Sequence, residues 1–168
     1  MSRRRASPPH VTRPAAGFLA ARIGIVASRF NAEIVESLLR GCIETLKTAG
    51  LPEAGHLLLR VPGAWELPWA VQTLARRYHP DAVIVLGAII RVETDHYRHL
   101  ARAVTDGLMT VGLHENVPVI LGLLTTDTWE QALERSGGKA GHKGVESADA
   151  ALEMVGLRHQ VQMDPSRT

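Results

Sequence analysis

Residues 81–90 (DAVIVLGAII) decide the fold of this chain. A continuous apolar run bounded by polar residues is typical of a strand buried on both faces of a parallel sheet. The run ends abruptly at Arg91, the polar residues 94–96 (TDH) follow, and a helical pattern starts at about Tyr97. Ligands of open α/β sheets bind outside the carboxyl ends of the strands, so the functional site is expected at this edge.

Apolar strands and amphipathic helices alternate along the rest of the sequence. Strands are expected at 21–27, 55–61, 82–89 and 118–124, and helices at 32–49, 65–78, 97–114, 128–135 and 143–157. Gly50 is the expected cap at the end of the first helix, Asp127 is the expected N-cap of the fourth, and 137–141 is expected to be a loop. This alternation favours right-handed crossovers. It predicts a flavodoxin-like α/β three-layer sandwich with a four-stranded parallel sheet and helices on both faces.

The composition indicates one globular domain over 18–158. The chain has 168 residues, of which 45% are hydrophobic and 21% charged, with a formal net charge of +2. Residues 1–17 form an Arg-rich, Pro-rich extension and 159–168 a polar tail. The extension is interpreted as a solvated tail; the alternative is an arm for RNA or another acidic partner, which the lack of interleaved aromatic residues disfavours.

Several classes of protein are disfavoured by missing features. Cys42 is the only cysteine, which excludes an internal disulfide and favours a buried core role for this thiol. The sequence shows no signal peptide and no membrane-spanning stretch, so a cytoplasmic protein without a membrane partner is expected. It also shows no zinc-type cluster, Walker A motif or GxGxxG, so no metal and no nucleotide site of those types is expected.

Distinctive side chains follow each predicted strand, in the segments 28–31 (SRFN), 62–66 (PGAWE), 91–96 (RVETDH) and 125–127 (TTD). Phe30 and Trp65 stand beside Asn31 and Glu66. An aromatic ring next to an amide or a carboxylate suits a flat heterocycle with a hydroxylated tail. The alternative is that the two rings only cover the edge of the sheet.

The third strand leads to groups suited to proton transfer and to phosphate. His96 is a candidate general acid or base, and the alternative is a capping or surface role at the start of the helix. Thr94 and the backbone N–H groups before that helix are candidates to hold a phosphate. Arg135 and Lys143, in the Gly-rich stretch 135–144 (RSGGKAGHKG), are candidate cations for it; the alternative is a solvated loop.

Five segments of the chain resemble the lumazine synthase (6,7-dimethyl-8-ribityllumazine synthase) family in order and spacing. They are IGIVASRFNAEIVESLL, RVPGAWELPWA, VIVLGAIIRVETDHY, LGLLTTDTWEQALERSGGKAGHKGVE and AALEM, which together span about 22–157. The resemblance implies a transferase of riboflavin biosynthesis that needs no cofactor. It condenses 5-amino-6-(D-ribitylamino)uracil with 3,4-dihydroxy-2-butanone 4-phosphate to the lumazine and releases phosphate.

The resemblance also implies roles for individual residues. His96 matches the residue that transfers protons. The phosphate is expected at Glu93, Thr94 and Arg135. The uracil and ribityl groups are expected at Phe30, Asn31, Ala64, Trp65, Glu66, Ala88, Ile89, Ile90, Leu121 and Lys143. In the family, Arg135 and the position of Leu121 come from the neighbouring subunit.

Five residues depart from the family pattern: Val92, Asp95, Arg98, His99 and Leu121. Val92 stands where a glycine is usual and would strain the loop if that position needs φ > 0. Val92, Asp95 and Leu121 support an alternative, a diverged paralogue that binds flavin-like or lumazine-like ligands without efficient turnover. A third interpretation is a structural shell protein.

Partners follow from the same resemblance. The family builds rings of five subunits, and some members pack these rings into an icosahedral 60-mer. The short segment 137–141 favours the 60-mer, with a decamer or a pentamer as alternatives. Riboflavin synthase is a candidate enclosed partner.

Overall fold

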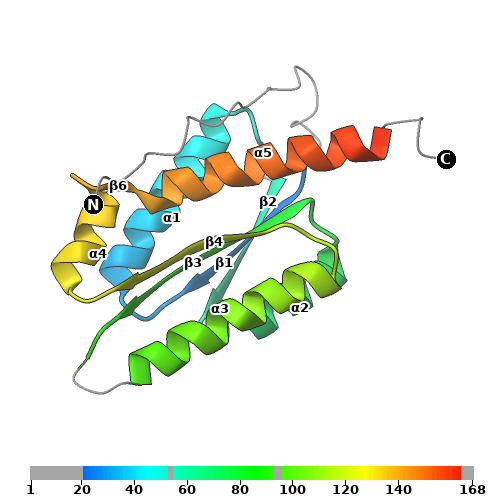
Figure 1. Cartoon of the computed structure of the whole chain (residues 1–168). Helices are drawn as coiled ribbons and strands as arrows, with labels where there is room; N and C mark the ends of the chain where they lie inside the picture. The colour runs from blue at the N-terminus through cyan, green and yellow to red at the C-terminus, as the bar shows by residue number, and fades with distance from the viewer. Residues whose placement is uncertain (1–20, 53–54, 93–95, 164–168) are drawn as a thin grey trace, which may run out of the picture.

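The computed structural model describes residues 21–52, 55–92 and 96–163, and its centre is a four-stranded parallel sheet (Figure 1). The strands are β1 (Ile23–Ser28), β2 (His56–Val61), β3 (Ala82–Ile90) and β4 (Val119–Thr126). Their order is β2-β1-β3-β4, which leaves β2 and β4 at the edges. The carboxyl ends of β3 and β4 lie at the left of Figure 1, beside α4 and the start of α3.

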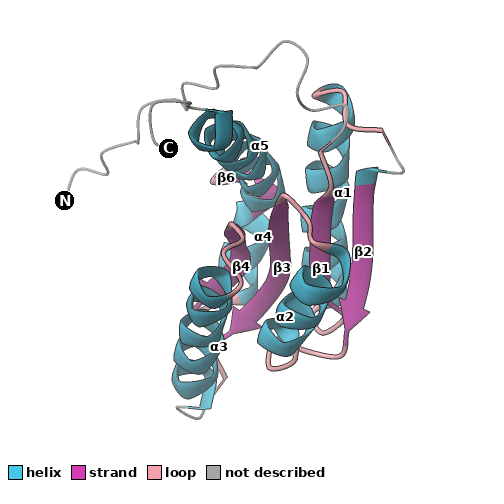
Figure 2. Ribbon diagram, turned by 90° about the vertical axis from the view of Figure 1, so that its right-hand side faces the viewer, coloured by secondary structure: helices cyan, strands magenta, loops and turns pink. Residues whose placement is uncertain are grey.

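Within the described ranges, five helices cover the sheet: α1 (Ala32–Thr48), α2 (Leu67–Tyr78), α3 (His96–His114), α4 (Trp129–Arg135) and α5 (Lys143–Met163). Figure 2 shows α1 and α5 on one face and α2 and α3 on the other. Ile23 and Ile25 of β1 pack toward α1 and α5, whereas Val26 packs toward α2 and α3. Both faces of the strand are therefore apolar, and the predicted α/β three-layer sandwich is confirmed.

Most element boundaries lie within two residues of the sequence prediction, and three local features differ from it more clearly. Residues 137–141 are not a simple loop, because β5 (Ser136–Gly138) and β6 (Gly141–His142) form an antiparallel hairpin. Helix α5 continues to Met163, beyond its predicted end at residue 157. The N-cap of α4 is Thr128, whose hydroxyl accepts a hydrogen bond from the Gln131 N–H at 3.2 Å, so the prediction of Asp127 was wrong.

The end of α1 follows its prediction. Gly50 has φ +90° and its N–H donates to the Lys47 carbonyl at 2.9 Å, which confirms its capping role. Cys42 lies on the buried face of the same helix, in the core between α1 and the sheet. Burial raises the pKa of the Cys42 thiol to about 12, so the side chain stays protonated at neutral pH. Its predicted role as a core residue is confirmed.

A polar cluster joins α2 to the end of α3 on the opposite face. The carboxylate of Glu115 accepts from Gln72 Nε2 at 3.0 Å and from Arg76 Nε at 2.9 Å, and His114 Nδ1 lies 3.2 Å away. The Glu115 side chain is only 14% exposed. The hydrogen bond from Arg76 is the largest cause that lowers the pKa of Glu115 from its ordinary 4.5 to about 2. The bonds from His114 and Gln72 and the charge of Arg76 add to it, and burial opposes it.

We expect Glu115→Gln to lower the melting temperature by a few degrees at pH 7. A lowered pKa in the folded state gives stability that is present above pH 4.5 and is lost as the pH falls toward 2. The difference in melting temperature between wild type and variant should therefore shrink across this window, as measured by thermal unfolding monitored by circular dichroism. Glu153→Gln is the matched control, because Glu153 is exposed on α5. A difference that stays constant from pH 7 to pH 2 would refute the assignment.

No helix among the described residues is both long enough and apolar enough to cross a membrane.

Candidate functional site

The loops that follow β1 and β2 are joined by backbone hydrogen bonds. The N–H of Arg29 donates to the Val61 carbonyl at 2.8 Å, and the N–H of Phe30 donates to the Pro62 carbonyl at 3.1 Å. These bonds continue the parallel pairing of the two strands beyond their ends. The structure thus brings the SRFN and PGAWE segments together, as the sequence predicted.

Asn31 connects this pair of loops to β3. It has φ 57°, a left-handed conformation that asparagine tolerates better than most residues. Its side chain makes no capping bond to α1; instead Nδ2 donates to the Ala88 carbonyl at 2.9 Å. Sequence reasoning placed Asn31 and Ala88 in one site but could not show that they bond to each other. One lone pair of the Ala88 oxygen is therefore already used.

Two aromatic rings at this edge are open to solvent. The Phe30 side chain is 71% exposed and that of Trp65 is 65% exposed. Most of the surface of each side chain is therefore available to stack on a ligand. Trp69, in the first turn of α2, is also exposed and was missed by the sequence analysis. The Trp-x₃-Trp spacing was the only signal for it.

Glu66 is held in place by its own loop. Its Oε2 accepts from the Gly63 N–H at 2.9 Å, while Oε1 makes no hydrogen bond to a described residue. Ala64 is buried beside it. The carboxylate is therefore oriented by one bond and keeps an oxygen free for a hydroxyl donor.

Charged side chains gather where β3 and β4 end. The Arg91 N–H donates to the Thr126 carbonyl at 2.9 Å, and Arg91 Nη1 lies 3.6 Å from Asp127 Oδ1. The guanidinium carbons of Arg91 and Arg98 each lie 5.8 Å from the centroid of the Tyr97 ring. This arrangement was not predicted, because it joins residues on a strand, a loop and a helix. Ala88 and Ile89 are buried and Ile90 is half-buried.

The predicted phosphate loop is described only in part. Glu93, Thr94 and Asp95 lie outside the described residues. Val92 is exposed and does not have a positive φ, so the strain considered for a residue at that position does not arise. His96 is exposed and is the first residue of α3. This places its imidazole at the carboxyl edge, as predicted.

Arg135 and Lys143 share one carboxylate. Arg135 Nη1 donates to the Ala140 carbonyl at 2.6 Å and to Glu146 Oε1 at 3.0 Å, and its Nη2 donates to Glu146 Oε2 at 3.0 Å. Lys143 Nζ lies 3.5 Å from the same Oε2. Burial by itself raises the pKa of Glu146, but the hydrogen bond and charge of Arg135, followed by those of Lys143, lower it overall. Glu146 thus stays ionised.

One edge of the Arg135 guanidinium is left open. A guanidinium has five N–H donors, and three of them are used by Ala140 and Glu146. The Nε–H and one Nη2–H make no hydrogen bond within the described residues. These two donors are parallel, a geometry that fits two oxygens of a phosphate. Two cations against one carboxylate also leave an excess of positive charge for an anion.

Comparison with known proteins identifies the family of the chain. Residues 20–159 match the family model of 6,7-dimethyl-8-ribityllumazine synthase. The chain belongs to this family. The 6,7-dimethyl-8-ribityllumazine synthase of Halorhodospira halophila is 49% identical to it over 142 residues, which cover 84% of this chain and 91% of the relative. The protein of the same name from Rhodopirellula baltica is 46% identical over 141 residues, with the same coverage of both chains. The resemblance inferred from the sequence is confirmed.

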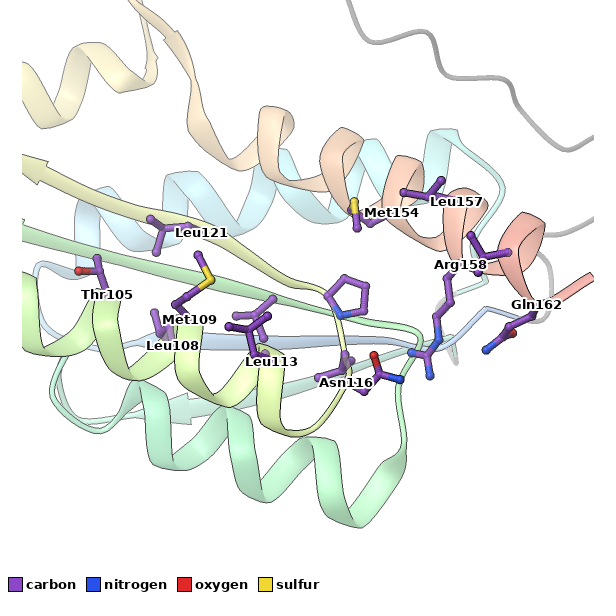
Figure 3. Close-up of a pocket in the computed structure, with 15 residues that line it drawn as sticks. Thr105, Leu108, Met109, Leu113, Asn116, Leu121, Met154, Leu157, Arg158 and Gln162 are labelled. Atoms are coloured by element: carbon purple, nitrogen blue, oxygen red, sulfur yellow. The ribbon is translucent and has the colours of Figure 1, made fainter. Parts of the chain in front are cut away.

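One residue expected in the lumazine synthase site lies elsewhere in this chain. Leu121 is in β4, opposite Val85, and its side chain is 44% exposed. It lines a groove of about 530 Å³ between α3, β4 and α5, which Figure 3 shows with Met109 and Leu113 on one wall and Met154 and Leu157 on the other. Within one chain, Leu121 is therefore not part of the group formed by Phe30, Asn31 and Glu66.

A metal centre is not formed by the described residues of this lumazine synthase family member. No three histidine, cysteine, aspartate or glutamate side chains among them are grouped to hold an ion.

Proposed function

We propose that this protein condenses 5-amino-6-(D-ribitylamino)uracil with 3,4-dihydroxy-2-butanone 4-phosphate to give 6,7-dimethyl-8-ribityllumazine, phosphate and water, as a step of riboflavin biosynthesis. The observation that carries the proposal is the family match over residues 20–159. That range includes every site residue named above. The chain also covers 91% of each of the two relatives that bear this name.

The uracil half of the site is proposed to lie at the loops after β1, β2 and β3. The open ring of Phe30 stacks on the pyrimidine, and backbone groups of Ala88, Ile89 and Ile90 recognise its polar edge. Asn31, Ala64, Trp65 and Glu66 line the ribityl chain. The free Oε1 of Glu66 supports this role, because it is an unused acceptor for a sugar hydroxyl.

The phosphate half is proposed to combine cations with a helix start. Arg135 offers its open Nε and Nη2 edge, and Lys143 adds a point charge beside it. The amino end of α3 supplies the positive end of a helix of 19 residues, and Glu93 and Thr94, which precede it in the sequence, are proposed to bind the same phosphate. Arg135, Lys143 and Leu121 are proposed to act in the site of the neighbouring subunit.

The reaction then requires mainly that the two substrates are held in position and that one residue transfers protons. An amine of the uracil substrate attacks the butanone carbonyl, and loss of water gives an imine. Loss of phosphate leaves an enol, which tautomerises to a ketone. The second nitrogen attacks this carbonyl, and loss of a second water closes the ring. His96 carries protons for imine formation and elimination, and holding both substrates together removes much of the entropic barrier. The open guanidinium edge of Arg135 stabilises the departing phosphate. No cofactor is required by this sequence of steps.

Assembly is proposed to complete the site. Strand β4 is an edge strand of the sheet, so one side of its backbone pairs with no strand among the described residues. The groove beside it exposes Met109, Leu113, Leu157 and Val161. An apolar groove next to a free strand edge fits burial against a second copy of this chain. Rings of five are proposed, with the 60-mer favoured over the decamer and the pentamer, and sedimentation velocity distinguishes the three.

A direct assay tests the function. The purified protein is mixed with both substrates, and the absorbance and fluorescence of the lumazine are followed. Product formation is expected. Binding of a ribityl ligand without product would favour the diverged paralogue instead, and neither binding nor product would favour a purely structural shell. The cytoplasmic location and the enclosure of riboflavin synthase remain predictions.

A further inference from the structure

The hairpin formed by β5 and β6 (136–142) is fastened to α1 at two points one helical turn apart. Ser37 Oγ donates to the Ser136 carbonyl at 2.6 Å. Ser136 pairs with His142 across the hairpin, and the ring of His142 lies against Gly41, four residues after Ser37. A single stripe of α1 therefore contacts both strands of the hairpin.

The His142 ring fills the space between the two elements. A methyl group on Gly41 would overlap Cε1 and Nε2 of this ring, and would lie 3.0 Å from Nδ1. On the other side, a methyl group on Gly137 would lie 3.3 Å from Cδ2. The ring is thus seated between glycines of α1 and β5, where only the absence of side chains gives it room.

The contact depends on the shape of the ring and not on hydrogen bonding through Nδ1. His142 Nδ1 is buried and has no hydrogen-bond partner in the described part of the chain. A buried polar atom without a partner disfavours the folded state, so packing must offset this effect. Beside the ring is a cavity of about 440 Å³ with Glu33 and Arg40 on its wall. The hairpin therefore has open space into which it can shift if the ring is removed.

Arg135 is connected to this hairpin. It is the residue before Ser136, and its Nη1 donates to the carbonyl of Ala140 in the turn. The peptide bond to Ser136 and the hydrogen bond to Ala140 thus connect Arg135 to the hairpin at both its backbone and its guanidinium. Glu146 of α5 holds the other side of the guanidinium. A shift of the hairpin relative to α1 would therefore turn the guanidinium against Glu146 and redirect the open Nε and Nη2 edge.

We propose that His142 is a positioning residue for the phosphate substrate: its ring sets the separation between α1 and the hairpin and so aims Arg135. This inference rests on the proposed function, in which Arg135 binds the phosphate. His142 touches no substrate; it acts through Arg135.

The test is a double-mutant cycle on Gly41 and His142, with KM for each substrate, kcat and melting temperature measured. His142→Ala should raise KM for the butanone phosphate roughly 10-fold, because small displacements of a binding group have large effects, and should leave KM for the uracil substrate unchanged. Gly41→Ala should raise KM for the phosphate substrate at least as much, because its methyl group displaces the ring. In the double variant, Gly41→Ala should add no further change, because the ring it overlaps is gone.

Gly156→Ala is the matched control, since a methyl group there meets no atom within 4 Å. It should leave both KM values unchanged. Additive effects of Gly41→Ala and His142→Ala, equal changes in both KM values, or an unchanged KM for the phosphate substrate in His142→Ala would each overturn the positioning role. If Gly41→Ala does not fold, His142→Ala alone still decides. Wild-type protein that makes no lumazine would instead overturn the proposed function.

Discussion

Turnover by His96→Ala is expected to be slower than that of the wild type by roughly 10²–10⁴, the usual contribution of a positioned acid or base. The imidazole starts α3 at the carboxyl edge of the sheet and is exposed, so it is free to meet a substrate. It is not among the groups proposed to hold the pyrimidine. Binding of the uracil substrate, measured by fluorescence titration, should therefore be nearly unchanged, while kcat, measured from lumazine formation, falls.

His99→Ala provides the control for this effect. His99 is exposed on the same helix, three residues further on, so the change removes an identical ring from a neighbouring place. Its turnover should stay close to that of the wild type. If His96→Ala left kcat unchanged, His96 would have no role in proton transfer. The family assignment would survive that result, since holding the two substrates together can carry most of the acceleration.

Arg135→Ala is expected to raise KM for the butanone phosphate roughly 10- to 100-fold, which corresponds to the loss of one charge-assisted hydrogen-bonding group. KM for the uracil substrate should change little. The reason is the open Nε and Nη2 edge, which offers two parallel donors that alanine lacks. Steady-state kinetics with each substrate varied in turn separates the two KM values.

Two further variants separate geometry from charge. Arg135→Lys keeps the positive charge but loses the paired donors, so it should recover only part of the affinity for the phosphate substrate. Lys139→Ala removes a cation from the same hairpin, where Lys139 is exposed, and should have little effect. Equal weakening of both substrates by Arg135→Ala would contradict the phosphate role.

The sheet and its site edge were predictable because their signals are local. The apolar run of β3 indicates a buried strand, and parallel strands necessarily bring their carboxyl ends to one edge of the sheet. Phe30, Trp65 and His96 could thus be assigned to a common edge from order alone. The family resemblance added the roles of these residues, which no periodicity contains.

The β5–β6 hairpin was missed because its conformation depends on a distant element. The stretch from Ser136 to His142 has too few apolar residues to show a period. Its position comes from Ser37 and Gly41, about a hundred residues earlier in the chain. The bond from Asn31 to Ala88 and the stacking of Arg91 on Tyr97 are contacts of the same kind. Side-chain contacts between separate elements leave no local trace in a sequence.

The buried thiol of Cys42 has a practical consequence. Burial keeps this side chain inaccessible, and a pKa of about 12 keeps it protonated at neutral pH, so maleimide reagents should leave the folded protein unlabelled. Cys42 is also the sole native cysteine. Lys139→Cys would then accept a single fluorophore a few residues from Arg135. The binding of inorganic phosphate could be followed by the fluorescence of this label without first replacing a native cysteine.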